Sequence, residues 1–179
     1  MFDMITNINL TTKETFLLED MKSHEEQCIL KYDNYHNLAS DPQLKAVFRS
    51  NAQIEREHLE TINQLLAGKV PNMSGGQSGG QQSGGQQSSG QQAPQQKSSG
   101  LTTFAQESTS SLGFNISDKD MCTDMLSMEK YVSGAYDTAI FEFKDSQVRD
   151  VLNHIQKEEQ KHGQAITSYM ISKGMYTLK

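Results

Sequence analysis

The sequence predicts an all-α fold: a four-helix bundle made of two repeated antiparallel helical hairpins joined by a long flexible crossover. Three observations predict it. The two ends of the chain are copies of one another, each copy holds two amphipathic segments with a short turn between them, and a Gly/Gln/Ser-rich stretch separates the copies. A duplicated hairpin is too long for a solenoid repeat, and its apolar faces are most readily buried against its own copy.

The internal repeat appears when residues 11–67 are compared with residues 117–174 at a constant shift of 104 positions. Identical pairs recur along both segments without a gap. They are Asp20/Asp124, Met21/Met125, Glu25/Glu129, Tyr32/Tyr136, Asp33/Asp137, Asp41/Asp145, Gln43/Gln147, Val47/Val151, Glu55/Glu159, His58/His162 and Ile62/Ile166. The two segments are therefore predicted to be duplicates of one hairpin.

Residues 11–67 form the first predicted hairpin. Its first helix runs from about Thr12 to Ala39 and opens on a capping box, Thr11-Thr12-Lys13-Glu14. Asp41-Pro42 places an N-cap residue before a proline at the first helical position, so the second helix starts there. Gly68 is the expected end of that helix.

Residues 68–116 are predicted to be a flexible linker. The run GGQSGGQQSGGQQSSGQQ has too little apolar surface to offset the entropy of ordering. A flexible chain of this length spans on the order of 40 Å, about the length of the predicted helices. The linker can therefore connect opposite ends of a bundle.

Residues 117–174 form the second predicted hairpin. Ser117-Asp118-Lys119-Asp120 opens its first helix, Asp145-Ser146 opens its second, and Gly174 closes it. The turn inside each hairpin is only a few residues long, so the paired helices must be antiparallel.

The inward-facing positions of all four helices contain charged residues. In each helix these positions recur at alternating steps of three and four residues, the seam of a left-handed bundle. Six ionisable residues lie on the seams near the helix centres and are paired by the repeat: Glu25, Glu55, His58, Glu129, Glu159 and His162. Buried carboxylates are costly unless they are paired, protonated or metal-bound.

These six residues have the pattern of a carboxylate di-metal site in a helical bundle, with one Glu from each of two helices and one Glu-x-x-His pair from each of the others. The i, i+3 spacing lets a Glu and a His face the same metal region. The predicted cofactors are two divalent ions, iron or manganese, with Glu25 and Glu129 as terminal ligands and Glu55 and Glu159 as bridges. His58 and His162 would supply nitrogen ligands.

A metal-free interpretation stands beside this one. A polar layer can specify the register of a bundle through Glu–His hydrogen bonds, or it can be a relic of a metal-binding ancestor. Tyr32 and Tyr136 are expected to pack in the core, where they could also donate hydrogen bonds to ligand carboxylates. Glu158 is expected on a solvated face, and it would replace Glu159 only if the register slipped. His24, His36 and His154 are expected at the surface.

The bulk composition limits the partners. The net charge of −6 argues against nucleic acid or an anionic membrane surface, and no apolar run is long enough for a membrane span. The N-terminal sequence lacks the pattern of a signal peptide, so none is expected. Cys28 and Cys122 form no motif and are expected to be buried thiols.

The second half carries a family resemblance in three places: from Asp118-Lys119-Asp120-Met121 through Ser127-Met128-Glu129-Lys130-Tyr131, in Ser133-Gly134-Ala135-Tyr136-Asp137-Thr138-Ala139, and in the ending Lys173-Gly174-Met175-Tyr176. In these residues it resembles the Coat F family of bacterial spore coat proteins. The first half resembles the N-terminal repeat of such proteins in Thr12-Lys13-Glu14, Leu18-Glu19-Asp20-Met21 and Ser23-His24-Glu25-Glu26-Gln27. Met175 departs from the pattern, where a Trp is common, and the linker is longer than expected. The resemblance implies a ferritin-like fold and a place in the endospore coat.

The predicted function is therefore a structural component of the endospore coat or a related sporulation protein. The protein would be made in the mother-cell cytoplasm, and its partners would be other coat proteins or further copies of itself, a homodimer included. Phe16, Leu17, Ile29 and Leu30 flank the first seam, where they either widen the inward face or bind a partner. The alternative function is a di-iron oxidoreductase, a ferroxidase or peroxide scavenger. It ranks second because the chain has no Cys pairs of the rubredoxin kind for electron delivery.

Overall fold

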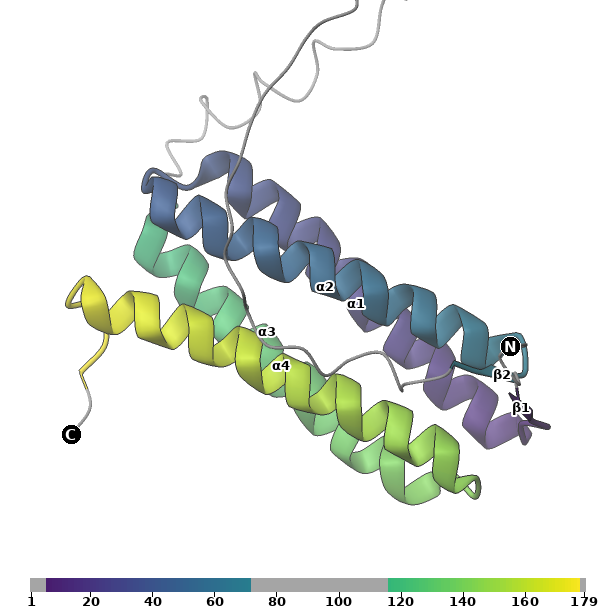
Figure 1. Cartoon of the computed structure of the whole chain (residues 1–179). Coiled ribbons are helices and arrows are strands. Elements are labelled where there is room, and N and C mark those ends of the chain that lie inside the picture. The colour runs from purple at the N-terminus through teal and green to yellow at the C-terminus, as the bar shows by residue number, and fades with distance from the viewer. Residues whose placement is uncertain (1–5, 72–115, 178–179) are drawn as a thin grey trace, which may run out of the picture. The chain divides into compact units, whose positions relative to one another are not determined.

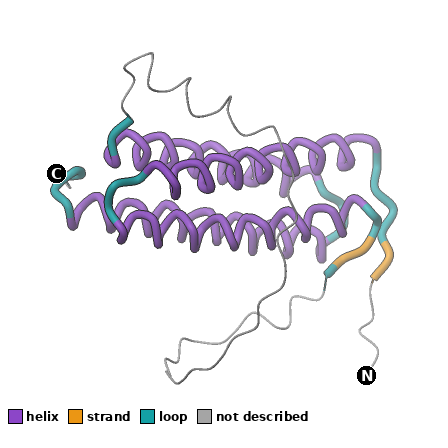
Figure 2. The backbone as a smooth tube through the Cα atoms, turned by 90° about the horizontal axis from the view of Figure 1, so that it is seen from above, coloured by secondary structure: helices purple, strands orange, loops and turns teal. Residues whose placement is uncertain are grey.

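The computed structural model describes residues 6–71 and 116–177, which contain four long helices. They are α1 (Thr12–Leu38), α2 (Pro42–Leu66), α3 (Asp118–Glu142) and α4 (Ser146–Ser172). Helices α1 and α2 form one antiparallel hairpin, α3 and α4 form the other, and the two hairpins pack into a four-helix bundle (Figures 1 and 2). The predicted fold class is confirmed, and each helix begins within a residue of its predicted start.

Side-chain caps explain where the helices begin. The hydroxyl of Thr11 accepts a hydrogen bond from the backbone N–H of Glu14, whose carboxylate accepts one from the N–H of Thr11. Ser117 and Asp120 form the equivalent capping box before α3. Aspartates cap α2 and α4, as expected from their short side chains and the extended backbone at each N-cap.

The first hairpin extends beyond its predicted limits at both ends. Strand β1 (Thr6–Asn7) pairs antiparallel with β2 (Lys69–Val70), and the N–H of Ile8 donates to the carbonyl of Gly68 at 2.9 Å. Gly68 turns the chain out of α2 with a φ of 75°, a conformation that glycine adopts without strain. The predicted linker, 68–116, therefore begins too early, and its remainder, 72–115, lies outside the described residues.

Two carboxylates at helix starts join the hairpins to each other. Glu14, at the start of α1, accepts a hydrogen bond from the backbone N–H of Lys144 at 3.0 Å. Asp118, at the start of α3, accepts from the N–H groups of Ser40 and Asp41 at 2.8 and 3.0 Å. Glu14 and Asp118 occupy equivalent positions of the repeat, so these bonds show that an approximate two-fold relation places each helix start against the turn of the other hairpin.

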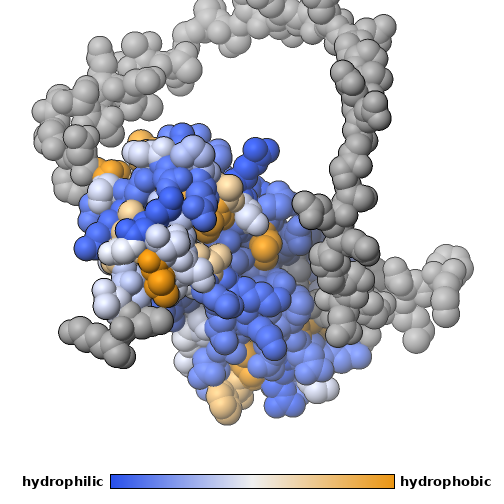
Figure 3. Space-filling view, turned by 60° about the vertical axis from the view of Figure 1, so that its left-hand side comes forward, coloured by the Kyte–Doolittle hydropathy of each residue, from blue (hydrophilic) through white to orange (hydrophobic). Residues whose placement is uncertain are grey.

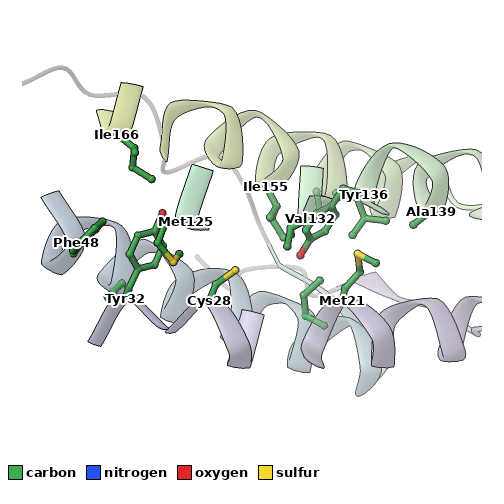
Figure 4. Close-up of a cluster of buried hydrophobic side chains, with 14 of the residues drawn as sticks. Met21, Cys28, Tyr32, Phe48, Met125, Val132, Tyr136, Ala139, Ile155 and Ile166 are labelled. Carbon is green, nitrogen blue, oxygen red and sulfur yellow. The ribbon is translucent and has the colours of Figure 1, made fainter. Parts of the chain in front are cut away.

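The core fills the space between the two hairpins. Side chains of α1 and α2 face those of α3 and α4, including Phe48, Met125 and Ile155 (Figure 4). Cys28 and Cys122 are both buried free thiols, as predicted. No helix in the described part of the chain carries an apolar stretch long enough to cross a membrane.

Several large apolar side chains remain outside the core. Phe16 and Leu30 are each 61% exposed, so the expectation that they widen the inward face of α1 is wrong for these two residues. Leu17 is half-buried and packs against the core, as expected, and Ile29 is half-buried. The visible face in Figure 3 is mainly hydrophilic, with separate apolar patches.

Candidate metal centre

All six predicted site residues lie together in the middle of the bundle. Their exposed fractions range from 0 to 3%. Glu25 comes from α1, Glu129 from α3, and the Glu-x-x-His pairs come from α2 and α4. The inward-facing positions of each helix point into the bundle, so charged residues from four separate segments of the sequence lie in one layer.

The six residues form two overlapping groups, each with ligand atoms within 4.8 Å of one another. One group is Glu25, Glu55, His58 and Glu159, and the other is Glu55, Glu129, Glu159 and His162. Glu55 and Glu159 belong to both. Two carboxylates shared between two clusters is the arrangement expected for bridging ligands.

Both histidines direct Nδ1 toward the carboxylates. Nδ1 of His58 lies 3.1 Å from Oε2 of Glu55 and 3.0 Å from Oε1 of Glu159. Nδ1 of His162 lies 3.0 Å from Oε1 of Glu55 and 3.6 Å from Oε2 of Glu129. The two imidazole rings are 5.7 Å apart between centroids, and Nδ1 of each ring contacts a carboxylate oxygen of Glu55.

Several carboxylate oxygens in this layer lack hydrogen-bond donors. Oε2 of Glu25, Oε2 of Glu129 and Oε2 of Glu159 are buried and accept no hydrogen bond from the described residues, and Oε1 of Glu159 has only the His58 imidazole beside it. A buried carboxylate oxygen without a donor is costly. Hard oxygen donors together with imidazole nitrogens suit divalent iron or manganese, so the donor set fits the two ions that the sequence predicts.

Two tyrosines hold the outer carboxylates in place. The hydroxyl of Tyr32 on α1 donates to Glu129 on α3, and the hydroxyl of Tyr136 on α3 donates to Glu25 on α1. Tyr32 and Tyr136 lie in the buried cluster of Figure 4, one near Phe48 and Met125 and the other near Val132 and Ile155. The tyrosines therefore pack in the core and also orient the carboxylates, which combines the two roles weighed from the sequence.

His58 and His162 differ in the partner of Nε2, the ring nitrogen that points away from the cluster. Nε2 of His58 lies 3.0 Å from Oε2 of Glu158, which is 24% exposed. Nε2 of His162 is buried and has no hydrogen-bond partner among the described residues. Sequence reasoning placed Glu158 on a solvated face and missed this contact, because its position is off the seam and the repeat has Ile54 in its place.

The other three histidines lie away from the centre. All of them are half-buried, which is less exposed than predicted. His154 lies 3.5 Å from Glu158, His36 contacts the carbonyl of Lys45, and His24 meets the ring of Tyr131 edge-on. None belongs to either cluster.

Burial and ion pairing decide which groups of the cluster carry protons. Burial raises the pKa of Glu25 well above its ordinary value and that of Glu129 to about 8. Burial would also raise the pKa of Glu55, but hydrogen bonds with His162 and His58 outweigh it and lower this pKa to about 2. Burial disfavours the charged form of His162, yet its carboxylate neighbours raise its pKa to about 11. Without metal, the layer therefore holds protons on the outer carboxyls and the imidazoles at neutral pH.

Comparison with known proteins supports the fold. Residues 117–179 match the model of the Coat F domain family. Among solved structures, the chain is similar to a two-domain protein from Anabaena variabilis that contains DJ-1/ThiJ/PfpI-like and ferritin-like domains, with a TM-score of 0.62 and 15% sequence identity. The match covers 96% of this chain and 40% of the other, so the chain spans well under half of that protein. No curated protein matches the sequence.

Proposed function

Since residues 117–179 match the model of the Coat F domain family, we propose that the protein is a structural component of the bacterial endospore coat. It would be made in the mother-cell cytoplasm and would assemble with other coat proteins or with further copies of itself. The domain match carries this proposal.

Four exposed apolar side chains are available for contact with a partner. Tyr131 is 63% exposed and Phe141 81% exposed, in addition to Phe16 and Leu30. Apolar residues exposed singly are common on folded proteins, so these four are compatible with assembly and do not by themselves define an interface. Phe16 and Leu30 lie on α1 while Tyr131 and Phe141 lie on α3, so both hairpins offer such residues.

Localisation during sporulation tests this role. A fluorescent fusion expressed from its own promoter is expected to appear only in sporulating cells and to move from the mother cell to the forespore surface. It should then fractionate with the coat of purified spores. Equal amounts in vegetative cells that never sporulate would contradict the proposal.

We also propose that Glu25, Glu55, His58, Glu129, Glu159 and His162 bind two divalent metal ions, iron or manganese. The observation that supports this is the pair of overlapping clusters that share Glu55 and Glu159. Such ions, when bound, supply redox and Lewis-acid chemistry toward oxygen or peroxide. The resulting activity would be that of a ferroxidase or a peroxide scavenger, and a coat protein can carry it without losing its structural role.

Metal analysis tests the second proposal. Protein purified without chelator is expected to contain about two iron or manganese ions per chain, and the Glu55→Ala/Glu159→Ala variant is expected to lose both. Glu57→Ala/Glu60→Ala is the matched control, because it removes two exposed glutamates from α2. Absence of metal after anaerobic loading with ferrous iron would leave the cluster as a polar core layer. If metal is present, peroxide consumption above the buffer rate is the next measurement.

A further inference from the structure

A pocket of about 500 Å³ lies between α3 and α4 and reaches the buried cluster. Its lining includes Glu129 and Glu159, together with the exposed residues Lys130, Asp137 and Gln160. The buried oxygens that accept no hydrogen bond from the described residues include Oε2 of Glu129 and Oε2 of Glu159. The pocket therefore ends against two of the proposed metal ligands, which are buried at its inner end with exposed fractions of 1% and 0%.

Two glycines contribute to this space. A Cβ atom at Gly163 on α4 would lie 3.5 Å from Cδ1 of Leu126 and 3.9 Å from Cβ of Glu129, so the two helices approach closely there. A Cβ at Gly134 on α3 would meet no atom of the described part of the chain within 4 Å. Glycine in a helix interior is less stable than alanine. A larger side chain at either position would extend into the pocket that both glycines line.

The equivalent face of the first hairpin, between α1 and α2, carries different residues. Leu59 and Leu30 occupy the positions equivalent to Gly163 and Gly134. Arg56 on α2 donates from Nη2 to both carboxylate oxygens of Asp33 on α1, at 2.8 and 2.7 Å, and so bridges that face.

The equivalent residues of the second hairpin, Gln160 and Asp137, line the pocket instead. The pocket on the α1–α2 face includes Arg56 and Asp33, and it is lined by none of the six proposed ligands. The duplication thus left two unlike faces around one cluster.

We propose that the α3–α4 pocket is a one-sided access route that admits a small exogenous ligand of the metals, of the class of peroxide and azide. This inference rests on the proposed metal centre. Two divalent ions would balance the four glutamates, so a small neutral or monoanionic ligand would meet no net repulsion. The Lys130 ammonium at the pocket lining favours anions, and Asp137 limits that preference.

Azide binding to the full-length cobalt-loaded protein tests the route, with visible absorption as the readout. The blocking variants are Gly163→Leu and Gly134→Leu, which restore the residue type of the first hairpin. Gln164→Leu is the control, because it adds a leucine to the exposed side of the same turn of α4. The rate of azide association, followed by rapid-mixing absorption, is expected to be equal for wild type and control. Each glycine variant is expected to bind azide about tenfold or more slowly while it retains the same cobalt content.

The possible outcomes distinguish failure of the access route from failure of the metal proposal. Equal rates of azide association in all four proteins with full cobalt content would overturn the access route and leave the metal proposal standing, as would a wild-type protein that binds cobalt but no azide. A wild-type protein that binds no cobalt would overturn both proposals. If Gly163→Leu loses cobalt because it disturbs the adjacent His162, the result for Gly134→Leu decides, because that position has open space around it.

Discussion

The hydroxyl of Tyr136 donates a hydrogen bond to the carboxylate of Glu25, across the boundary between the two hairpins. Tyr32 makes the equivalent bond to Glu129 in the opposite direction. The two bonds differ in their surroundings, because Nδ2 of Asn51 donates to the hydroxyl of Tyr32 at 3.0 Å whereas the repeat places Ile155 opposite Tyr136.

This difference predicts unequal effects of removing the hydroxyls. Tyr32→Phe leaves both Glu129 and the Asn51 amide without a partner, while Tyr136→Phe deprives Glu25 alone. A buried group that loses its partner costs about 1–3 kcal/mol, so Tyr32→Phe is expected to lower the free energy of unfolding by about 1 kcal/mol more than Tyr136→Phe. Urea denaturation of the metal-free variants measures the difference. Equal losses would argue against a structural role for the Asn51 bond.

The carboxylate of Glu14 is expected to stabilise the packing of one hairpin on the other. Glu14 is 2% exposed and accepts hydrogen bonds from the N–H groups of Thr11 and Lys144. Glu14→Ala removes an N-terminal cap bond and an interhairpin bond, so it is expected to cost about 2 kcal/mol of unfolding free energy. Glu19→Ala, which truncates an exposed glutamate of the same helix, should cost less than about 0.5 kcal/mol. Urea denaturation of both variants gives the comparison, and similar losses would refute the role of Glu14.

Stability without metal is expected to fall as the pH rises from 6 to 9. The folded-state pKa of Glu129 is raised from 4.5 to about 8, so its stabilising contribution is complete below pH 4.5 and lost as the pH rises through 8. The raised pKa of His162, from 6.5 to about 11, gives a contribution that is complete below 6.5 and declines above it. Circular dichroism melts of the metal-free protein should therefore show a lower Tm at pH 9 than at pH 6.

Bound metal is expected to reverse this trend. Metal ions compete with the protons on Glu25, Glu129 and the two histidines, so metal binds more tightly at high pH. The rise in Tm on adding Mn²⁺ should be larger at pH 9 than at pH 6. An increase that does not depend on pH would mean that Mn²⁺ binds outside the cluster, and Glu55→Ala/Glu159→Ala provides that control.

Glu158 is expected to tune one of the two proposed metal positions. Its carboxylate lies 3.0 Å from Nε2 of His58, and Nε2 of His162 has no such partner among the described residues. Loss of an outer carboxylate that orients a ligating histidine typically costs 10–100-fold in metal affinity. Glu158→Gln should therefore weaken one of two binding steps by roughly that factor in a calorimetric titration with Mn²⁺. Weakening of both steps to the same degree would contradict the assignment, and Glu57→Gln on α2 is the control.

The repeat and the seams predict most of this structure. Identical spacing in both halves predicts that Glu55 and Glu159 meet, because residues near the helix centres of a duplicated hairpin lie close to the two-fold axis that relates it to its copy. Equivalent residues farther from the centres, such as Tyr32 and Tyr136, lie on opposite sides of the cluster. Capping residues predict the helix starts because their bonds are local. What the pattern misses depends on side chains that cross between elements. Glu158 reaches His58 from outside the seam, Glu14 and Asp118 bond to turns of the other hairpin, and β1 pairs with a strand more than sixty residues away in the chain.

Each cluster takes three residues from one hairpin and one from the other, since Glu159 completes the group on the first hairpin and Glu55 completes the group on the second. Neither hairpin alone carries a full set. Separation of the hairpins would remove one of the four ligands from each ion and leave the other three on a single hairpin. Bound metal would therefore hold the two hairpins together, and opening of the bundle would weaken both metal positions at once.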